Sequence, residues 1–256
     1  AYRRLRLAMD YWCALWFWPI ERYNELPTRA EFLFDLENLL LGDTLATEVP
    51  GQTSELFADT EHRERGKQFV TRFGVVNLKT LFRQAPRLKL ADRIAQQQRF
   101  LHWELAFADL FHQRGGFDLV LGNPPWIKVE WDESGVLGEF EPVFALRKFS
   151  ATQLKNLREA TFHQYAQLQS AWAAEYAENE GIQLFLNSVG NYQDLEGQKA
   201  NLYKCFLPRA WQLQSERGVS GFLHPEGIYD DPKGGGLRSA AYLRLRRHFQ
   251  FQNERK

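Results

Sequence analysis

A short apolar run in the middle of the chain constrains the fold more than any other feature. Phe117-Asp118-Leu119-Val120-Leu121 follows a Gly-Gly pair and ends at Gly122, the pattern of a strand buried on both faces of a sheet. Asn123-Pro124-Pro125-Trp126 comes directly afterwards. Open α/β sheets bind ligands outside the carboxyl ends of their strands, so this loop is the predicted functional site. The alternative is a rigid loop whose prolines only end the strand.

Helical and strand patterns alternate along the rest of the chain. Apolar spacing predicts helices over residues 2–18, 28–42, 150–180, 199–216 and 237–248, and over residues 61–99 with an interruption near Pro86. Thr28 and Glu31 have the spacing of a capping box. Further strands are expected at 101–107, 181–186 and 219–223. The predicted fold class is α/β with mainly parallel strands, with a helical, locally basic segment over 1–99 and an α/β domain over 100–256.

Composition narrows the classes of protein that the chain can be. The 32 Lys and Arg residues balance 32 Asp and Glu residues, which excludes a wholly basic nucleic-acid binder. Cys13 and Cys205 form no CxxC pair, so neither a disulfide framework nor a metal site is expected, and a reducing cytoplasm is the default. The apolar stretch 11–20 is too short to cross a membrane. Both chain ends suggest a piece excised from a longer protein.

The loop after the central strand resembles a known catalytic motif. Asn123-Pro124-Pro125-Trp126 is similar to the Asn/Asp/Ser-Pro-Pro-aromatic motif of amino-group DNA methyltransferases, and Gly116-Phe117-Asp118 with Gly122 resembles the adenine-N6 branch. Segments 102–105, 201–206 and 218–225 resemble the large methyltransferases of restriction-modification and phage-defence systems. The resemblance covers residues 100–256. It implies part of a Rossmann-like sheet and methyl transfer from S-adenosylmethionine to adenine N6 in double-stranded DNA.

The resemblance also implies roles for individual residues. Asn123 Oδ1 and the Pro124 carbonyl would accept the N–H groups of the target adenine, and Asn123 and Pro125 would also contact the methyl donor. Trp126 would stack on the flipped base, a contact worth about 1–3 kcal/mol. Tyr203 is placed near the target-base pocket, although its helical spacing with Phe206 favours a core position.

The glycine-rich turn that binds S-adenosylmethionine in this family is not evident. Residues 1–116 contain no strand followed by Gly-x-Gly. Asp231-Pro232-Lys233-Gly234-Gly235-Gly236 superficially resembles it, but Leu237 stands where glycine is needed. The donor-binding loop is therefore expected outside this chain. The expected partners are double-stranded DNA and the remainder of the same polypeptide. The competing interpretation is a non-catalytic DNA-binding or assembly module with a relic motif.

Other charged residues allow further interpretations. The segment 61–99 contains ten Lys and Arg residues but only three acidic residues. Arg83, Arg87 and Lys89 within it either contact DNA phosphates or lie on a solvated helix face. Glu254 and Lys256 have the spacing of a nuclease site but lack a strand context. His102 is expected to be a surface or hydrogen-bonded histidine rather than a catalyst.

Overall fold

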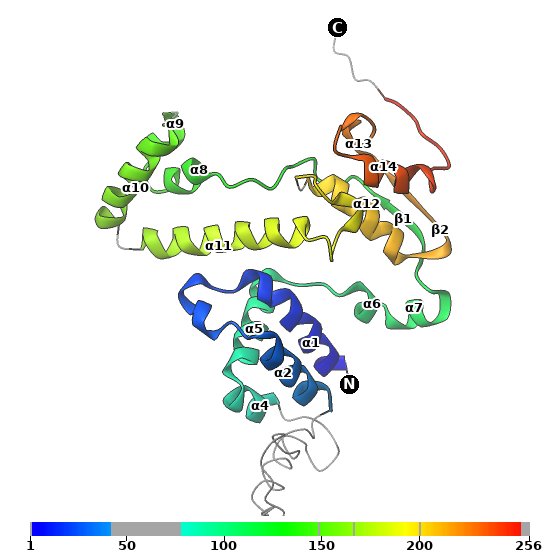
Figure 1. Cartoon of the computed structure of the whole chain (residues 1–256), viewed down its shortest axis with the longest axis horizontal. Helices are drawn as coiled ribbons and strands as arrows, with labels where there is room; N and C mark the ends of the chain where they lie inside the picture. Colours follow the sequence, from blue (N-terminus) through cyan, green and yellow to red (C-terminus); the bar gives the residue numbers. More distant parts are fainter. Residues whose placement is uncertain (1, 42–77, 148, 166, 200, 252–256) are drawn as a thin grey trace, which may run out of the picture. The chain divides into compact units, whose positions relative to one another are not determined.

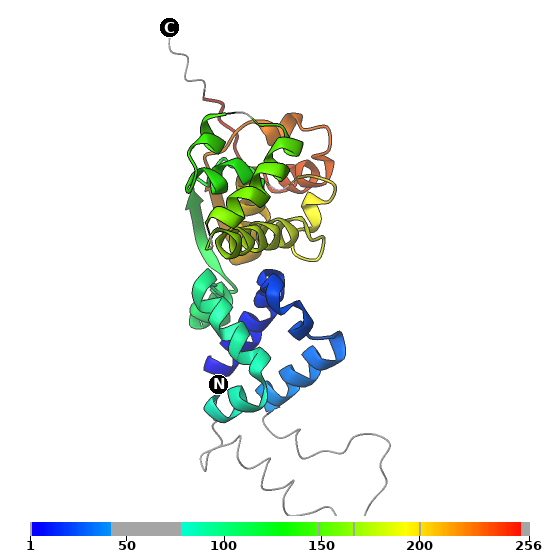
Figure 2. The ribbon, with the colours of Figure 1, turned by 90° about the vertical axis from the view of Figure 1, so that its left-hand side faces the viewer.

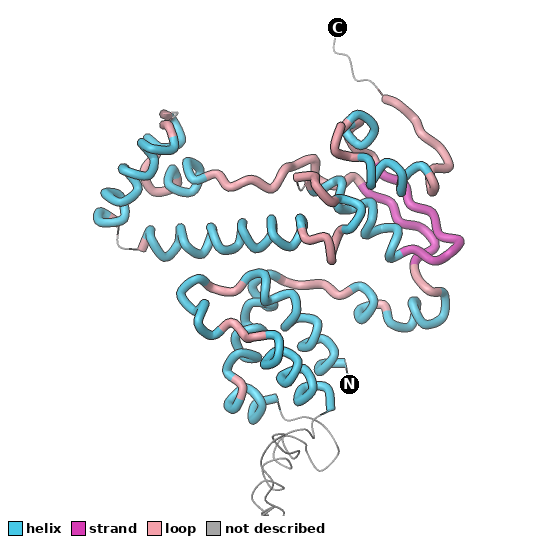
Figure 3. Tube along the Cα trace, in the orientation of Figure 1, coloured by secondary structure: helices cyan, strands magenta, loops and turns pink. Residues whose placement is uncertain are grey.

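The computed structural model describes residues 2–41, 78–147, 149–165, 167–199 and 201–251. The chain divides into two compact units: Ala1–Ala108 with Glu133–Gly181, and Asp109–Asp132 with Ile182–Lys256. We call these unit 1 and unit 2. The described residues are mostly helical, with one small parallel sheet of two strands (Figure 3). Among them, no helix combines the length and apolar character needed to cross a membrane.

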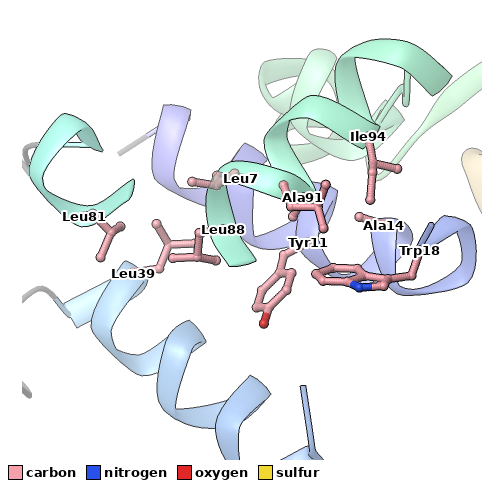
Figure 4. Close-up of a cluster of buried hydrophobic side chains, with 10 residues drawn as sticks. Leu7, Tyr11, Ala14, Trp18, Leu39, Leu81, Leu88, Ala91 and Ile94 are labelled. Atoms are coloured by element: carbon pink, nitrogen blue, oxygen red, sulfur yellow. The ribbon is translucent and has the colours of Figure 1, made fainter. Parts of the chain in front are cut away.

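The first part of unit 1 is a helical bundle. It contains α1 (Tyr2–Ala14), the 3-10 segments η1 (Leu15–Phe17) and η2 (Ile20–Glu25), α2 (Arg29–Leu41), α4 (Leu78–Gln84) and α5 (Pro86–Gln98). Helices α1, α2 and α5 lie side by side in Figures 1 and 2. Figure 4 shows their apolar side chains meeting around Tyr11, Leu39 and Leu88, each fully buried. Burial of these side chains supplies the main driving force for the bundle.

Local signals predicted this bundle correctly. Thr28 Oγ1 accepts from the Glu31 amide at 3.3 Å, and Glu31 Oε2 accepts from the Thr28 amide at 2.8 Å, which confirms the capping box. Pro86 separates α4 from α5 by standing at the first position of α5, where its missing N–H costs nothing. Gly42 and residues 61–77 lie outside the described residues.

The strand predicted at 101–107 is wrong. Trp103–Ala106 forms the short helix α6, followed by α7 (Ala108–Arg114). The rings of Trp103 and Phe107 stack at 5.7 Å, the contact expected of residues four apart on helical backbone. The alternation of apolar and polar residues over seven positions did not distinguish a strand from a helical turn.

Residues 150–187 also differ from the prediction. Two helices, α10 (Ala151–Gln164) and α11 (Leu168–Asn187), are present where one helix was expected over residues 150–180. Helix α11 also includes residues 181–186, where a strand was expected. Ile182, Phe185 and Leu186 are spaced three and four apart, so a helix presents them to one cluster. Gly181 lets α11 approach η1 closely, since a Cβ there would lie 2.5 Å from the Trp16 carbonyl oxygen. Helices α8 (Glu133–Gly138) and α9 (Val143–Leu146) complete unit 1.

Unit 2 contains the sheet. Strands β1 (Phe117–Gly122) and β2 (Gln214–Phe222) run parallel, and α12 (Leu202–Leu213) leads into β2 (Figure 1). The unit also holds η4 (Gln193–Leu195), α13 (Gly227–Asp230) and α14 (Gly235–Tyr242). The α12 and α14 helices are shorter than the predicted 199–216 and 237–248. Strand β2 begins five residues before the predicted 219, at Gln214, with Gly218 inside a shift of register.

Strand β1 is not buried on both faces, contrary to the expectation. Leu119 is 58% exposed and Leu121 is 70% exposed. Among the described residues, β1 and β2 pair only with each other. The observed α/β character is therefore limited to a two-stranded parallel sheet within a mostly helical chain.

Candidate active site at the carboxyl end of the sheet

The two strands end next to each other, directly before the motif. Gly122 is the register partner of Phe222, and the Leu223 amide donates to the Gly122 carbonyl at 3.1 Å. Asn123 and Pro125 are exposed where β1 ends, whereas Pro124 is buried. The motif loop therefore leaves the carboxyl edge of a parallel sheet, the position that the sequence predicted.

Trp126 is anchored by its edge and open to solvent. Its indole Nε1 donates to the Leu223 carbonyl at 3.4 Å, and 55% of the residue is exposed. This hydrogen bond joins the motif loop to the segment that follows β2. An aromatic ring held at one edge with much of its surface free is suited to stacking against a ligand.

The segment after Trp126 brings helix α12 to the motif. The Leu202 amide donates to the Ile127 carbonyl at 3.0 Å, and Lys128 forms an antiparallel bridge with Asn201. The next residue on α12, Tyr203, is 3% exposed and belongs to the apolar core of unit 2. Burial raises the pKa of its phenol, so the ring stays neutral.

His224 and Lys204 are two residues to which the sequence analysis gave no role. The His224 ring follows β2 and stacks on Tyr203, with centroids 6.0 Å apart and an interplanar angle of 9°. Lys204 is buried, and its Nζ donates to Gln198 Oε1 at 2.9 Å and to an Asp231 carboxylate oxygen. That contact holds the pKa of Asp231 below its ordinary value. In the sequence, Lys204 could have been singled out because it stands among the apolar residues at the start of α12.

The glycine run after Asp231 lacks the geometry of a donor-binding loop. It follows helix α13 rather than a strand, and Gly235 already begins α14. The Asp231 carboxylate is occupied by Lys204 and by the backbone amide of Lys233 at 2.9 Å. The described residues thus do not provide the strand, glycine turn and helix that bind S-adenosylmethionine.

The three predicted DNA-contacting cations have different environments. Arg83 and Lys89 are exposed on α4 and α5. The Arg87 guanidinium lies 2.6 Å from Glu31 Oε1 and 3.4 Å from Asp35 Oδ2, so it joins α5 to α2. Hydrogen bonds from Thr28 and the Arg87 contact lower the pKa of Glu31 to about 2.

His102 is a hydrogen-bonded histidine, as expected. Its Nε2 lies 2.8 Å from Asp10 Oδ1, and Asp10 is 4% exposed. The contact joins α1 to the residue that precedes α6. Cys13 and Cys205 are thiols rather than members of a disulfide, and burial raises the pKa of Cys205 to about 12.

Comparison with known families gives these features a context. The sequence profile of the Eco57I restriction-modification methylase family matches residues 8–166, more than half of the chain. The chain belongs to this family. The matched region includes the Asn123-Pro124-Pro125-Trp126 loop and extends through the N-terminal helical bundle, which the sequence analysis had left outside the resemblance. No curated protein and no solved structure matches the chain.

Proposed function

We propose that this member of the Eco57I restriction-modification methylase family is part of a site-specific DNA methyltransferase acting on the N6 amino group of adenine. One observation carries the proposal: the Asn-Pro-Pro-Trp loop leaves the carboxyl edge of a parallel strand pair with Asn123, Pro125 and Trp126 exposed. Restriction-modification or phage defence in the cytoplasm is the corresponding biological setting.

The motif residues suit the chemistry of an aromatic amine. The lone pair of an adenine amino group is delocalised into the ring, so the nitrogen is a poor nucleophile. Asn123 Oδ1 and the Pro124 carbonyl accept its two N–H groups, which favours localisation of the lone pair. S-adenosylmethionine, when bound, supplies an electrophilic methyl group. A neutral Asn123 side chain orients the amine without acting as a base.

Trp126 supports the flipped target base. An adenine within a duplex presents its amino group inside the stack, so the base has to rotate out before it is methylated. The exposed indole, fixed to Leu223 by its Nε1 hydrogen bond, offers the stacking surface. Tyr203 shapes the pocket through the core behind it rather than through direct contact, consistent with its burial.

The donor-binding loop lies outside the described residues in this proposal. Asn123 and Pro125 contact the donor from one side, and the remainder of the polypeptide supplies the glycine turn. Additional parallel strands would complete a Rossmann-like sheet by pairing with the edges of the β1–β2 ladder, and helices packed on its face would cover Leu119 and Leu121. Residues 100–256 are then part of the catalytic domain, and Arg83 and Lys89 on the N-terminal helices α4 and α5 lie along DNA phosphates.

The test is transfer of labelled methyl groups to double-stranded DNA by the complete polypeptide. We expect Asn123→Ala to abolish transfer, because the amine loses a hydrogen-bond acceptor made for the reaction. Asn156→Ala, an exposed asparagine on α10, is the matched control and should leave transfer unchanged. Equal activity of Asn123→Ala and wild type would favour the competing proposal, a DNA-binding or assembly module with a relic motif.

A further inference from the structure

His224 lies next to the motif loop and has no role in the function proposed above. Strand β2 ends at Phe222, the register partner of Gly122, and Leu223 receives the indole hydrogen bond of Trp126. His224 is the next residue. Its backbone therefore leaves the sheet at the same edge as Asn123, which follows Gly122.

The His224 ring is held in place by aromatic neighbours. Tyr203 of α12 stacks nearly parallel to it, and Tyr229 of α13 lies against it with a centroid distance of 6.3 Å. The turn behind the ring is tightly packed, since a Cβ on Gly227 would come within 2.9 Å of the Tyr203 hydroxyl. The Tyr203 contact is stacked, with an interplanar angle of 9°, and the Tyr229 contact is tilted by 36°.

One polar contact determines which ring nitrogen carries the proton. His224 Nδ1 lies 2.8 Å from the Pro225 carbonyl oxygen. A carbonyl oxygen only accepts hydrogen bonds, so Nδ1 must carry hydrogen. In the neutral ring Nε2 then presents a lone pair, and His224 is half-buried rather than enclosed.

The titratable groups around His224 are two phenols and three carboxyl groups. Burial raises the phenol pKa of both Tyr203 and Tyr229, so these rings stay neutral near pH 7. Asp230 and Asp231 raise the pKa of Tyr203 further. Glu226, the second residue after His224, is exposed. Histidine is the side-chain type that ordinarily exchanges a proton near neutral pH.

We propose that His224 Nε2 accepts the proton that the target amino nitrogen loses when it is methylated. This inference rests on the proposed adenine-N6 activity. Asn123 Oδ1 and the Pro124 carbonyl orient the amine, but amide oxygens are too weakly basic to keep a proton. Bound S-adenosylmethionine would supply the methyl group: the nitrogen lone pair would form the new N–C bond while the methyl–sulfur bond would break with its electron pair leaving on sulfur. One N–H bond breaks, its electron pair stays on nitrogen, and the proton moves to Nε2 directly or through one water molecule.

Single-turnover methyl transfer by the complete polypeptide tests the proposal as a function of pH. The wild-type rate should fall tenfold per pH unit on an acidic limb, where Nε2 is already protonated. His224→Asn should lower the rate at neutral pH about tenfold or more and remove that limb. His248→Asn is the matched control: His248 also lies against Tyr229, at 4.6 Å, and its variant should keep both rate and limb.

Two further measurements separate a chemical role from a packing role. Added imidazole should restore activity to His224→Gly but have no effect on wild type. In the unliganded wild-type protein, ¹⁵N signals of the His224 ring should show the Nδ1–H tautomer.

An unchanged acidic limb in His224→Asn, no imidazole rescue, or the Nε2–H tautomer would each overturn the proposal. If wild type produces N6-methyladenine but any of these three results is observed, the proposed adenine-N6 activity stands and the role of His224 is wrong. If wild type modifies no adenine, the proposed function fails and the His224 proposal fails with it.

Discussion

Replacement of Arg87 by Gln should destabilise the N-terminal bundle. The guanidinium joins α5 to two carboxylates on α2, and Asp35 among them has a side chain that is only 6% exposed. In Arg87→Gln, Asp35 keeps the hydrogen bond from the Tyr11 hydroxyl, which is 2.8 Å in wild type, but loses its ion pair with the Arg87 guanidinium. Removing one partner of a fully buried ion pair costs about 3–5 kcal/mol. The Arg87 side chain is 24% exposed, and the Tyr11 hydrogen bond to Asp35 remains in the variant. We therefore expect the free energy of unfolding to fall by about 1–3 kcal/mol.

Urea unfolding at pH 7, followed by tryptophan fluorescence, measures this loss. Lys89→Gln on the same helix and Arg83→Gln on the neighbouring α4 are matched controls at exposed cations, and each should change the free energy of unfolding by less than about 0.5 kcal/mol. Asp35→Asn in the Arg87→Gln background should recover part of the loss, because the uncompensated charge is removed.

The same defect should depend on pH. Burial raises the pKa of Asp35 and Arg87 opposes that rise, so the pKa should increase further in Arg87→Gln. A carboxyl whose folded-state pKa exceeds its unfolded value gains relative stability as the pH falls through the folded pKa. The difference between variant and wild type should therefore narrow as the pH falls through the folded-state pKa of Asp35. Equal unfolding midpoints for Arg87→Gln, Arg83→Gln and wild type would refute the reasoning.

Three further tests use variants of the site and of the charged surface. Trp126→Ala should weaken binding of target DNA by about 1–3 kcal/mol, whereas Trp126→Phe keeps most of the stacking; equal losses in a DNA titration would make Trp126 a packing residue. Asp231→Asn should lower the free energy of unfolding by about 1–3 kcal/mol, because the buried Lys204 ammonium loses its anion. The lowered pKa of Asp231 means that wild type loses this contribution as the pH falls through that pKa, so equal urea midpoints at pH 7 would contradict the assignment. Arg83→Gln combined with Lys89→Gln should flatten the logarithmic salt dependence of DNA affinity by about 1–2 units, and an unchanged slope would assign both to a solvated face.

Sequence reasoning succeeded where the determinants are local. The Thr28–Glu31 capping box and the proline that begins α5 each act within one helical turn, so their effect is visible in a few letters. The Asn123-Pro124-Pro125-Trp126 loop is also a contiguous signal, and the strand that precedes it forms as β1. Its position at a strand end followed from that order alone.

The failures concern features that depend on distant partners. The alternation near Trp103 fits a strand only if a neighbouring strand pairs with it, and the described residues place a helical turn there instead. The apolar run 181–186 joins α11 because a helix directs Ile182 and Leu186 to the unit 2 core. The position of His224 beside the motif results from pairing of residues a hundred positions apart, which no local pattern encodes.

The chemical identity of the methylated base distinguishes an adenine-N6 methyltransferase from other amino-group methyltransferases. DNA treated with the complete polypeptide and S-adenosylmethionine should be digested to nucleosides and analysed by mass spectrometry. We expect N6-methyladenine, at one recurring sequence context, in wild type but not in Asn123→Ala. N4-methylcytosine as the product, or N6-methyladenine at equal levels in wild type and Asn123→Ala, would contradict it.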